Sequence, residues 1–184
     1  MAITLVKEDG TGLANANAYA SAADGDAYHA GHLYATAWTG ATDDQKAAAL
    51  VMATRLIDGQ YQFNGLRSQS GQALQWPRVN CPDPDKAPIP VPTSLLLYDP
   101  FVPFSIVPKV LVLATCEMAR ELLVADRTAS LPGEGLKYYN NGGTQTGYDK
   151  SDRRPVISPV AQAMLIKFGS MVSAKSGAVR LVRA

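Results

Sequence analysis

The sequence is poor in the residues that most often catalyse reactions, bind metals or cross-link a chain. Its 184 residues include only two cysteines, Cys81 and Cys116, and two histidines, His29 and His32. A disulfide framework needs denser pairing in a shorter chain, so both cysteines are expected to be free thiols. With so few histidines, neither a His-containing catalytic triad nor a zinc site has a ready set of residues. We therefore expect a non-enzymatic protein with no cofactor and no metal.

Long apolar runs are also missing. The longest run, 110–114, is bounded by Lys109 and Glu117 and is far shorter than the roughly 20 residues that span a bilayer. Residues 7–9 are charged, where a secretory signal would have a basic segment followed by an apolar one. We expect no membrane helix, no signal peptide and no membrane partner.

The net charge is close to zero, with 17 Lys and Arg against 16 Asp and Glu. This balance gives no general support for binding nucleic acid or an anionic membrane. It nevertheless conceals a strong asymmetry along the chain. Residues 1–44 contain six acids and one base, whereas residues 153–184 contain six bases and no acid. The chain therefore has an acidic beginning and a basic end.

Two motifs suggest chemistry at first sight. His29 and His32, with Asp26, have a spacing that could hold a metal on one side of a helix, but Gly31 indicates that the helix ends there. Two surface histidines are the expected outcome. The segment 9–12, Asp-Gly-Thr-Gly, is similar to the Asp-Thr-Gly of aspartic proteases, but that chemistry needs two such carboxylates and no second copy occurs. This segment predicts a turn.

Capping residues and hydrophobic spacing predict four helices, at 21–29, 42–58, 107–126 and 158–169. Residues 137–148 predict a β-hairpin around Asn-Gly-Gly. The fold class is therefore mainly α, a small bundle of about four helices with a short hairpin. The expected core residues are Leu50, Leu56, Trp76, Leu111, Met118 and Leu122.

A long proline-rich loop interrupts this pattern at 77–107. Nine of the twelve prolines lie between Pro77 and Pro108, which excludes a helix or a central strand there. The loop is too apolar for a solvated linker, so it should lie against its own domain or a neighbouring subunit. We predict one helical domain over 1–169, followed by a basic tail at 170–184.

Two segments could contact a partner. Trp76 and Arg78 could stack on a base and bind a phosphate, although a single Trp belongs more often to a core. In the basic tail, Val179 and Leu181 alternate with Arg180, which favours docking onto a protein partner, for example as an added strand.

Five segments, in sequence order, resemble the small head-to-tail connector (adaptor) proteins of tailed phages, a family that also carries the label DnaT-like single-stranded-DNA-binding protein. The segments are 9–19 (DGTGLANANAY), 55–58 (RLID), 61–67 (YQFNGLR), 73–78 (ALQWPR) and 106–110 (IVPKV). The loop between the last two is longer than the family pattern leads one to expect, which leaves its role open.

The resemblance implies a structural subunit of the phage neck that forms a ring, typically of twelve copies, at the head-tail junction of the virion. It would be made in the host cytoplasm. Its partners would be copies of itself, the portal protein, the next neck or tail protein, and genomic DNA passing through the channel without sequence-specific contact. Contacts to the portal or a neighbour are expected from Arg153, Arg154, Lys175, Arg180 and Arg183. Contacts between subunits are expected from Leu96, Tyr98, Phe101 and Phe104.

The alternative is a single-stranded-DNA-binding protein of phage replication. Such a protein needs an aromatic and basic groove. Apart from Trp76 and Arg78, the sequence shows no clear interleaving of aromatic and basic residues. The adaptor ring is therefore the leading hypothesis from sequence.

Overall fold

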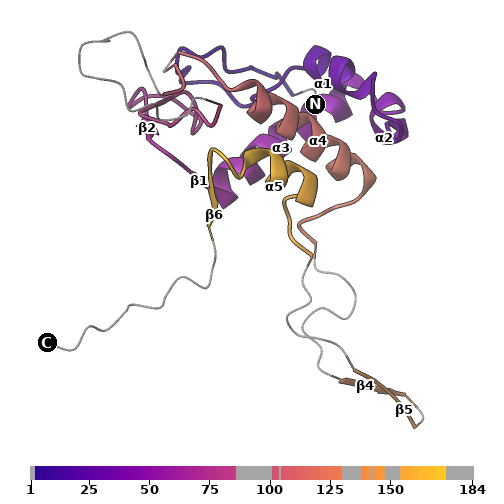
Figure 1. Cartoon of the computed structure of the whole chain (residues 1–184). Helices are drawn as coiled ribbons and strands as arrows, with labels where there is room; N and C mark the ends of the chain where they lie inside the picture. Colours follow the sequence, from indigo (N-terminus) through magenta and orange to yellow (C-terminus); the bar gives the residue numbers. More distant parts are fainter. Residues whose placement is uncertain are drawn as a thin grey trace, which may run out of the picture.

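The computed structural model shows a helical body, with one β-hairpin lying away from it (Figure 1). It describes residues 3–85, 101–103, 105–129, 138–141, 143–147 and 154–172. Along these residues the elements run α1, α2, α3, β1, β2, β3, α4, β4, β5, α5 and β6. The body is made of helices that lie far apart in the sequence.

Three helices form the centre of the body. Helix α3 (Asp43–Gln60) packs against α4 (Lys109–Val124), and α4 packs against α5 (Pro159–Leu165). The predicted capping box is present at α3, where the Thr42 side chain accepts from Gln45 N and the Gln45 side chain accepts from Thr42 N. Ser158 caps α5 as predicted, but α5 ends at Leu165 instead of continuing to residue 169. The chain leaves α5 because residues 169–171 pair with a strand.

Two shorter helices cover α4. Helix α1 (Ala22–His29) begins at the predicted cap, Ser21, whereas α2 (Thr36–Thr39) was not predicted. A four-residue helix has no hydrophobic period to detect, and its one buried residue is Trp38. The indole lies directly on Gly25, where an added Cβ would be 2.2 Å from a ring carbon. A glycine in α1 therefore makes room for the aromatic residue of α2.

The strands form three small antiparallel pairs. β1 (Tyr61–Phe63) pairs with β6 (Gly169–Met171), and β2 (Leu66–Arg67) pairs with β3 (Arg78–Val79). β4 (Tyr138–Asn141) and β5 (Thr144–Gly147) form the predicted hairpin. The described part of the chain therefore contains five helices and three strand pairs. The fold is mixed α and β, and the predicted mainly α fold class is wrong. The first residues of the predicted tail, 170 and 171, belong to β6.

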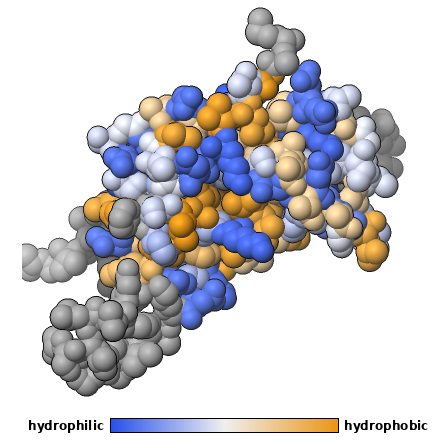
Figure 2. Space-filling model, turned by 90° about the horizontal axis from the view of Figure 1, so that it is seen from above, coloured by the Kyte–Doolittle hydropathy of each residue, from blue (hydrophilic) through white to orange (hydrophobic). Residues whose placement is uncertain are grey.

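Most of the expected core is fully buried. Leu50, Trp76, Leu111 and Met118 have at most 1% of their surface exposed. Leu56 and Leu122 pack against this core while remaining half-buried. Hydrophobic and hydrophilic side chains are interleaved on the face seen in Figure 2, which is typical of a protein whose apolar residues are largely inside.

Both cysteines lie inside the protein. Cys81 and Cys116 are buried and free, as predicted. Burial raises the pKa of Cys81, and raises that of Cys116 to about 12. Among the helices that the structure describes, none combines the length and apolar character of a bilayer span.

Candidate nucleic-acid interface

Trp76 belongs to the core and cannot stack on a base from its place in the fold. Its side chain is completely buried, with Phe63 and Phe168 edge-on at ring-centre distances of 5.8 and 6.1 Å. Aromatic pairs at this distance and angle are favourable packing arrangements. The prediction that Trp76 is a core residue is therefore confirmed, and the alternative that it stacks on a base is wrong.

Arg78 is also engaged inside the protein. It is 7% exposed, and its guanidinium donates to the backbone carbonyls of Asn64 (2.7 Å), Gly65 (2.6 Å) and Phe63 (3.2 Å). A further pair of bonds at 3.0 and 3.1 Å reaches Gln75. Burial lowers the pKa of Arg78. The residue ties the end of β1 to the 75–78 segment, so none of its donors is directed at a phosphate.

A buried polar network lies beside Trp76. The Tyr19 hydroxyl donates to Asp58 Oδ1. The backbone N–H of Gln75 donates to the Tyr19 hydroxyl oxygen and to Asp58 Oδ2, at 3.0 Å in each case. Burial, and secondly the Asp58 charge, raises the pKa of Tyr19 well above its ordinary value. Burial also raises the pKa of Asp58 to about 6, although the hydrogen bonds from Tyr19 and Gln75 lower it. This network joins the start of the chain, α3 and the segment before β3.

The Asp-Gly-Thr-Gly segment wraps around a buried carboxylate that sequence reasoning did not single out. Glu8 is 1% exposed, and its oxygens accept from the backbone N–H groups of Gly10 (3.0 Å), Gly12 (2.9 Å) and Leu13 (2.9 Å). Gly10 has φ +101°, and a Cβ there would lie 2.1 Å from a backbone oxygen of Ser105. The predicted turn is present, and its role is to pack the loop.

The histidine pair is not part of a three-ligand cluster among the described residues. His29 is buried, with Nε2 3.2 Å from the carbonyl oxygen of Cys116, so its expected surface position is wrong. Asp26 instead accepts from Trp38 Nε1 and Lys46 Nζ, both at 2.8 Å. The described residues contain no group of three potential metal ligands. His29 is a core residue because α2 folds over it.

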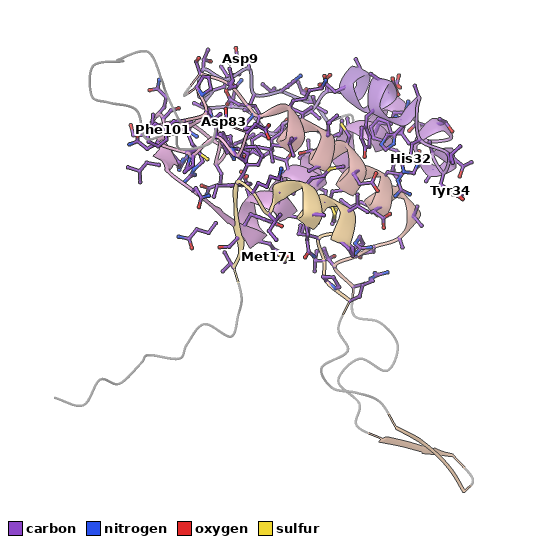
Figure 3. The ribbon with its side chains drawn as sticks, viewed as in Figure 1. Asp9, His32, Tyr34, Asp83, Phe101 and Met171 are labelled. Atoms are coloured by element: carbon purple, nitrogen blue, oxygen red, sulfur yellow. The ribbon has the colours of Figure 1, made fainter. Side chains whose placement is uncertain are left out.

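The proline-rich loop begins and ends at one place on the body. Pro82 and Phe101 form an antiparallel bridge, and Val102 N donates to Cys81 O at 2.9 Å. Phe101 is 36% exposed at this base, beside Asp83 in Figure 3. The other expected inter-subunit contacts, Leu96, Tyr98 and Phe104, lie outside the described residues.

The β4–β5 hairpin lies outside the helical body. Its register pairs Tyr138 with Gly147, Tyr139 with Thr146, Asn140 with Gln145 and Asn141 with Thr144. The rest of the ribbon consists of Asn, Gln, Thr and Gly residues. Figure 1 shows the hairpin apart from the helical body. An isolated two-stranded hairpin is marginally stable in water, so this element is expected to gain stability from a partner.

The stretch that carries the hairpin is fastened at both ends. Arg127 is 8% exposed and donates to the carbonyls of Pro155 and Val156, each at 2.8 Å. Arg154, one of the predicted contact residues, donates to the Asp126 carbonyl at 3.1 Å. The remaining predicted basic contacts, Arg153, Lys175, Arg180 and Arg183, lie outside the described residues.

Two adjoining hollows near α1 and the start of α4 have volumes of about 580 and 550 Å³. Lys7 lines both, but its ammonium group is paired with Asp24 at 2.7 Å. The apolar residues Val107 and Val112 also line both hollows. A lining of this kind does not provide the continuous basic track that a nucleic-acid backbone requires.

The fold therefore defines a small protein with a helical body and a hairpin arm. The chain matches the family described as "Putative DnaT-like ssDNA binding protein" over residues 3–184 and belongs to that family. No curated protein matches the chain. No solved structure matches it either.

The tyrosines of the hairpin were missed as candidate DNA contacts. The signal was present in the sequence, because Tyr138 and Tyr139 open a predicted hairpin and directly follow Lys137. Trp76 and Arg78 also combine an aromatic residue with a basic one in the sequence. Only burial shows that those two residues are unavailable.

Proposed function

We propose that this protein binds single-stranded DNA through the β4–β5 hairpin, without catalysing a reaction. Membership of the DnaT-like family supports DNA binding in general. The observation that carries the assignment to the hairpin is its pair of consecutive tyrosines, Tyr138 and Tyr139, on a ribbon apart from the body. Stacking a base on an aromatic side chain contributes about 1–3 kcal/mol and tolerates any base. The expected ligand is therefore a single strand without strong sequence preference.

Charge near the hairpin supports the same ligand. The sequence places Lys137 immediately before β4, and Lys150 and Arg153 after β5, where Asp149 and Asp152 stand beside them, so residues 137–154 carry four bases and two acids. Arg154 lies where the chain returns to the body, with one guanidinium bond to Asp126 O. Basic side chains that neutralise phosphates make affinity fall with salt. The basic residues of 170–184 would add to this attraction without base recognition.

The test measures the affinity of the purified full chain for a fluorescent oligo-dT of about 20 nucleotides at low salt. The double variant Tyr138→Ala, Tyr139→Ala should bind at least roughly 30-fold more weakly, since it loses two stacked bases at about 1–3 kcal/mol each. Tyr34→Ala is the matched control, because Tyr34 is 76% exposed on the helical body (Figure 3), outside the hairpin, and its loss should leave affinity unchanged. Undiminished binding by the double variant would refute the hairpin assignment, and no binding by the wild type would refute the function.

A second candidate is the adaptor ring of a phage neck in the virion. The observation that favours it is the exposure of apolar residues at two separate ends of the body. Leu33 and Tyr34 are 90% and 76% exposed at one end, and Phe101, which is 36% exposed, lies at the other (Figure 3). A ring needs two different complementary faces of this kind. Copies of the chain, a portal protein and a neck or tail protein would be the partners.

Native mass spectrometry of the chain, alone and mixed with a portal protein, tests this second candidate. A closed oligomer near twelve copies that binds the portal would support it. A chain that stays monomeric in both samples would contradict it. Leu33→Ser together with Tyr34→Ser should dissociate such a ring, whereas the exposed Arg55→Gln should not.

A further inference from the structure

The segment that joins α1 to α2 carries two exposed apolar side chains. Leu33 is 90% exposed and Tyr34 is 76% exposed, more than any other large hydrophobic residue in the described part of the chain. The backbone N–H of Tyr34 donates to Nδ1 of His32 at 3.0 Å, and the two ring centres are 6.4 Å apart (Figure 3). The backbone N–H of His32 in turn donates to the carbonyl of His29, the last residue of α1, at 3.0 Å. His32 therefore links the backbone that carries both apolar side chains to the helical body.

The hydrogen bond to Tyr34 determines where His32 carries its hydrogen. A ring nitrogen accepts a hydrogen bond only when it has no hydrogen of its own, so the neutral ring holds its hydrogen on Nε2. A second proton would go to Nδ1 and would make it a donor that faces the N–H of Tyr34. The charged form of His32 therefore excludes this bond. The His32 side chain is 26% exposed, so protons reach it from solvent.

The titratable groups around His32 come from both neighbouring helices. On α4, Glu117 Oε2 lies 3.8 Å from His32 Nε2, which is too far for a hydrogen bond. Arg120 donates to Glu117 Oε1 at 2.6 Å, and its positive charge opposes a second one nearby. On α1, the Tyr28 hydroxyl donates to Glu117 Oε2 at 3.4 Å, and the ring centre of His29 is 5.8 Å from that of His32. Burial lowers the pKa of His29, which favours its neutral form.

Glu117 is the favourable partner for a charged His32. Its side chain is buried, and the strong bond from Arg120 is made to Oε1. Oε2 receives only the longer bond from Tyr28 among the described residues, so it can accept from a further donor. A hydrogen bond between two ionised groups is roughly twice as strong as one between neutral groups. A charged ring that turns toward Oε2 thus regains at Nε2 what it loses at Nδ1.

We propose that His32 is a proton-sensitive switch, in which the neutral ring holds the Tyr34 amide and the charged ring leaves that amide and binds Glu117. Histidine changes its charge between about pH 5 and 8, so mild acid operates the switch. A surface held in one conformation loses less conformational entropy on binding than a mobile one. Contacts that Leu33 and Tyr34 make with a partner should therefore weaken in acid. The inference does not depend on DNA binding.

The first experiment determines the tautomer of His32 by NMR of the full chain labelled with nitrogen-15 in histidine. At pH 8, Nδ1 should give the signal of a ring nitrogen without hydrogen and Nε2 that of an N–H group. At pH 5, both nitrogens should carry hydrogen. A hydrogen on Nδ1 at pH 8, or a ring that remains neutral at pH 5, would overturn the proposal.

The second experiment measures how fast the Tyr34 amide exchanges with solvent, by saturation transfer at pH 8 and by deuterium exchange at pH 5. Each rate is divided by that of an unstructured peptide at the same pH. Protection of the amide should fall roughly 2- to 12-fold from pH 8 to pH 5, as expected for the loss of one hydrogen bond. The amide of Trp38, which donates to the Ala35 carbonyl at 2.9 Å, should keep its protection. Equal loss at both amides would indicate general unfolding and would overturn a local switch.

His32→Phe separates the hydrogen bond from the ring, because phenylalanine keeps an aromatic side chain without an acceptor. In this variant the Tyr34 amide should be as poorly protected at pH 8 as it is in the wild type at pH 5. The matched control is Asp44→Asn, which removes an exposed titratable group at the start of α3 and should leave the wild-type pH dependence intact. A pH-dependent Tyr34 amide in His32→Phe would show that another group is responsible.

Glu117→Gln tests the partner of the charged ring. Removing the carboxylate charge should make His32 harder to protonate, so the loss of Tyr34 protection should move to lower pH. An unchanged pH dependence would exclude Glu117 as the partner. If this variant does not fold, a crystal structure of the wild type at pH 5 is the second measurement. His32 Nε2 should then lie within about 3.2 Å of Glu117 Oε2, and a separation as long as the present 3.8 Å would contradict the proposed movement.

Discussion

Replacing Glu8 by glutamine tests whether one buried carboxylate holds the 9–13 loop in place. In the native protein, one oxygen accepts from Gly10 N and Gly12 N at 3.0 and 2.9 Å, and the other accepts from Leu13 N at 2.9 Å. Glutamine retains the first oxygen but places an NH₂ group where the second was. That NH₂ group faces the Leu13 N–H, so two donors oppose each other.

The expected cost follows from these three bonds. A hydrogen bond to a charged group contributes about 1.5–3 kcal/mol, and a buried donor left without an acceptor costs about 1–3 kcal/mol. Two bonds become neutral and one is lost, so Glu8→Gln should lower the free energy of unfolding by about 2–4 kcal/mol. For a chain of this size each kcal/mol lowers Tm by roughly 2–4 °C. A fall in Tm of roughly 4–16 °C is expected.

Urea unfolding followed by tryptophan fluorescence measures this change, because both tryptophans are buried. The matched control is Asp9→Asn, which removes a carboxylate from the same loop. Asp9 is exposed and accepts from Thr11 N and Thr11 Oγ1, at 2.9 and 2.6 Å, so its loss should cost less than about 1 kcal/mol. Equal destabilisation by the two variants, or less than about 0.5 kcal/mol for Glu8→Gln, would show that the buried carboxylate does not organise the loop.

Two further predictions concern other buried groups. The pKa of Asp58 is about 6 in the folded protein, above its ordinary value of 3.8, so the folded state holds the proton more tightly. Its contribution to stability is therefore complete below about pH 4 and lost as the pH rises through 6. The free energy of unfolding of Asp58→Asn, which stays neutral, should rise by about 1–3 kcal/mol relative to that of wild type as the pH increases from 4 to 7.5, as measured by urea titrations. A difference between the two proteins that stays constant with pH would contradict this prediction. Gly25→Ala should unfold at least 5 °C below wild type in calorimetry, because its methyl group would overlap Trp38, whereas the open site Gly59 should tolerate alanine.

Local features of the fold were predictable because short stretches of chain determine them. The caps at Ser21, Thr42 and Ser158 each satisfy N–H groups within three residues, so the sequence alone locates those helix starts. The Asn-Gly-Gly turn locates the β4–β5 hairpin in the same way. The end of α5 was not predictable, since β6 forms by pairing with β1, about 100 residues earlier in the chain.

The candidate site shows the same division. Composition and local spacing are enough to predict the helical core, the hairpin, and the separation of acidic and basic residues along the chain. That Trp76 and Arg78 are internal, and that Arg127 donates to Pro155 and Val156, is seen only in the folded chain. Burial and carbonyl partners come from segments distant in sequence, and no local pattern specifies which aromatic residue the rest of the chain will cover.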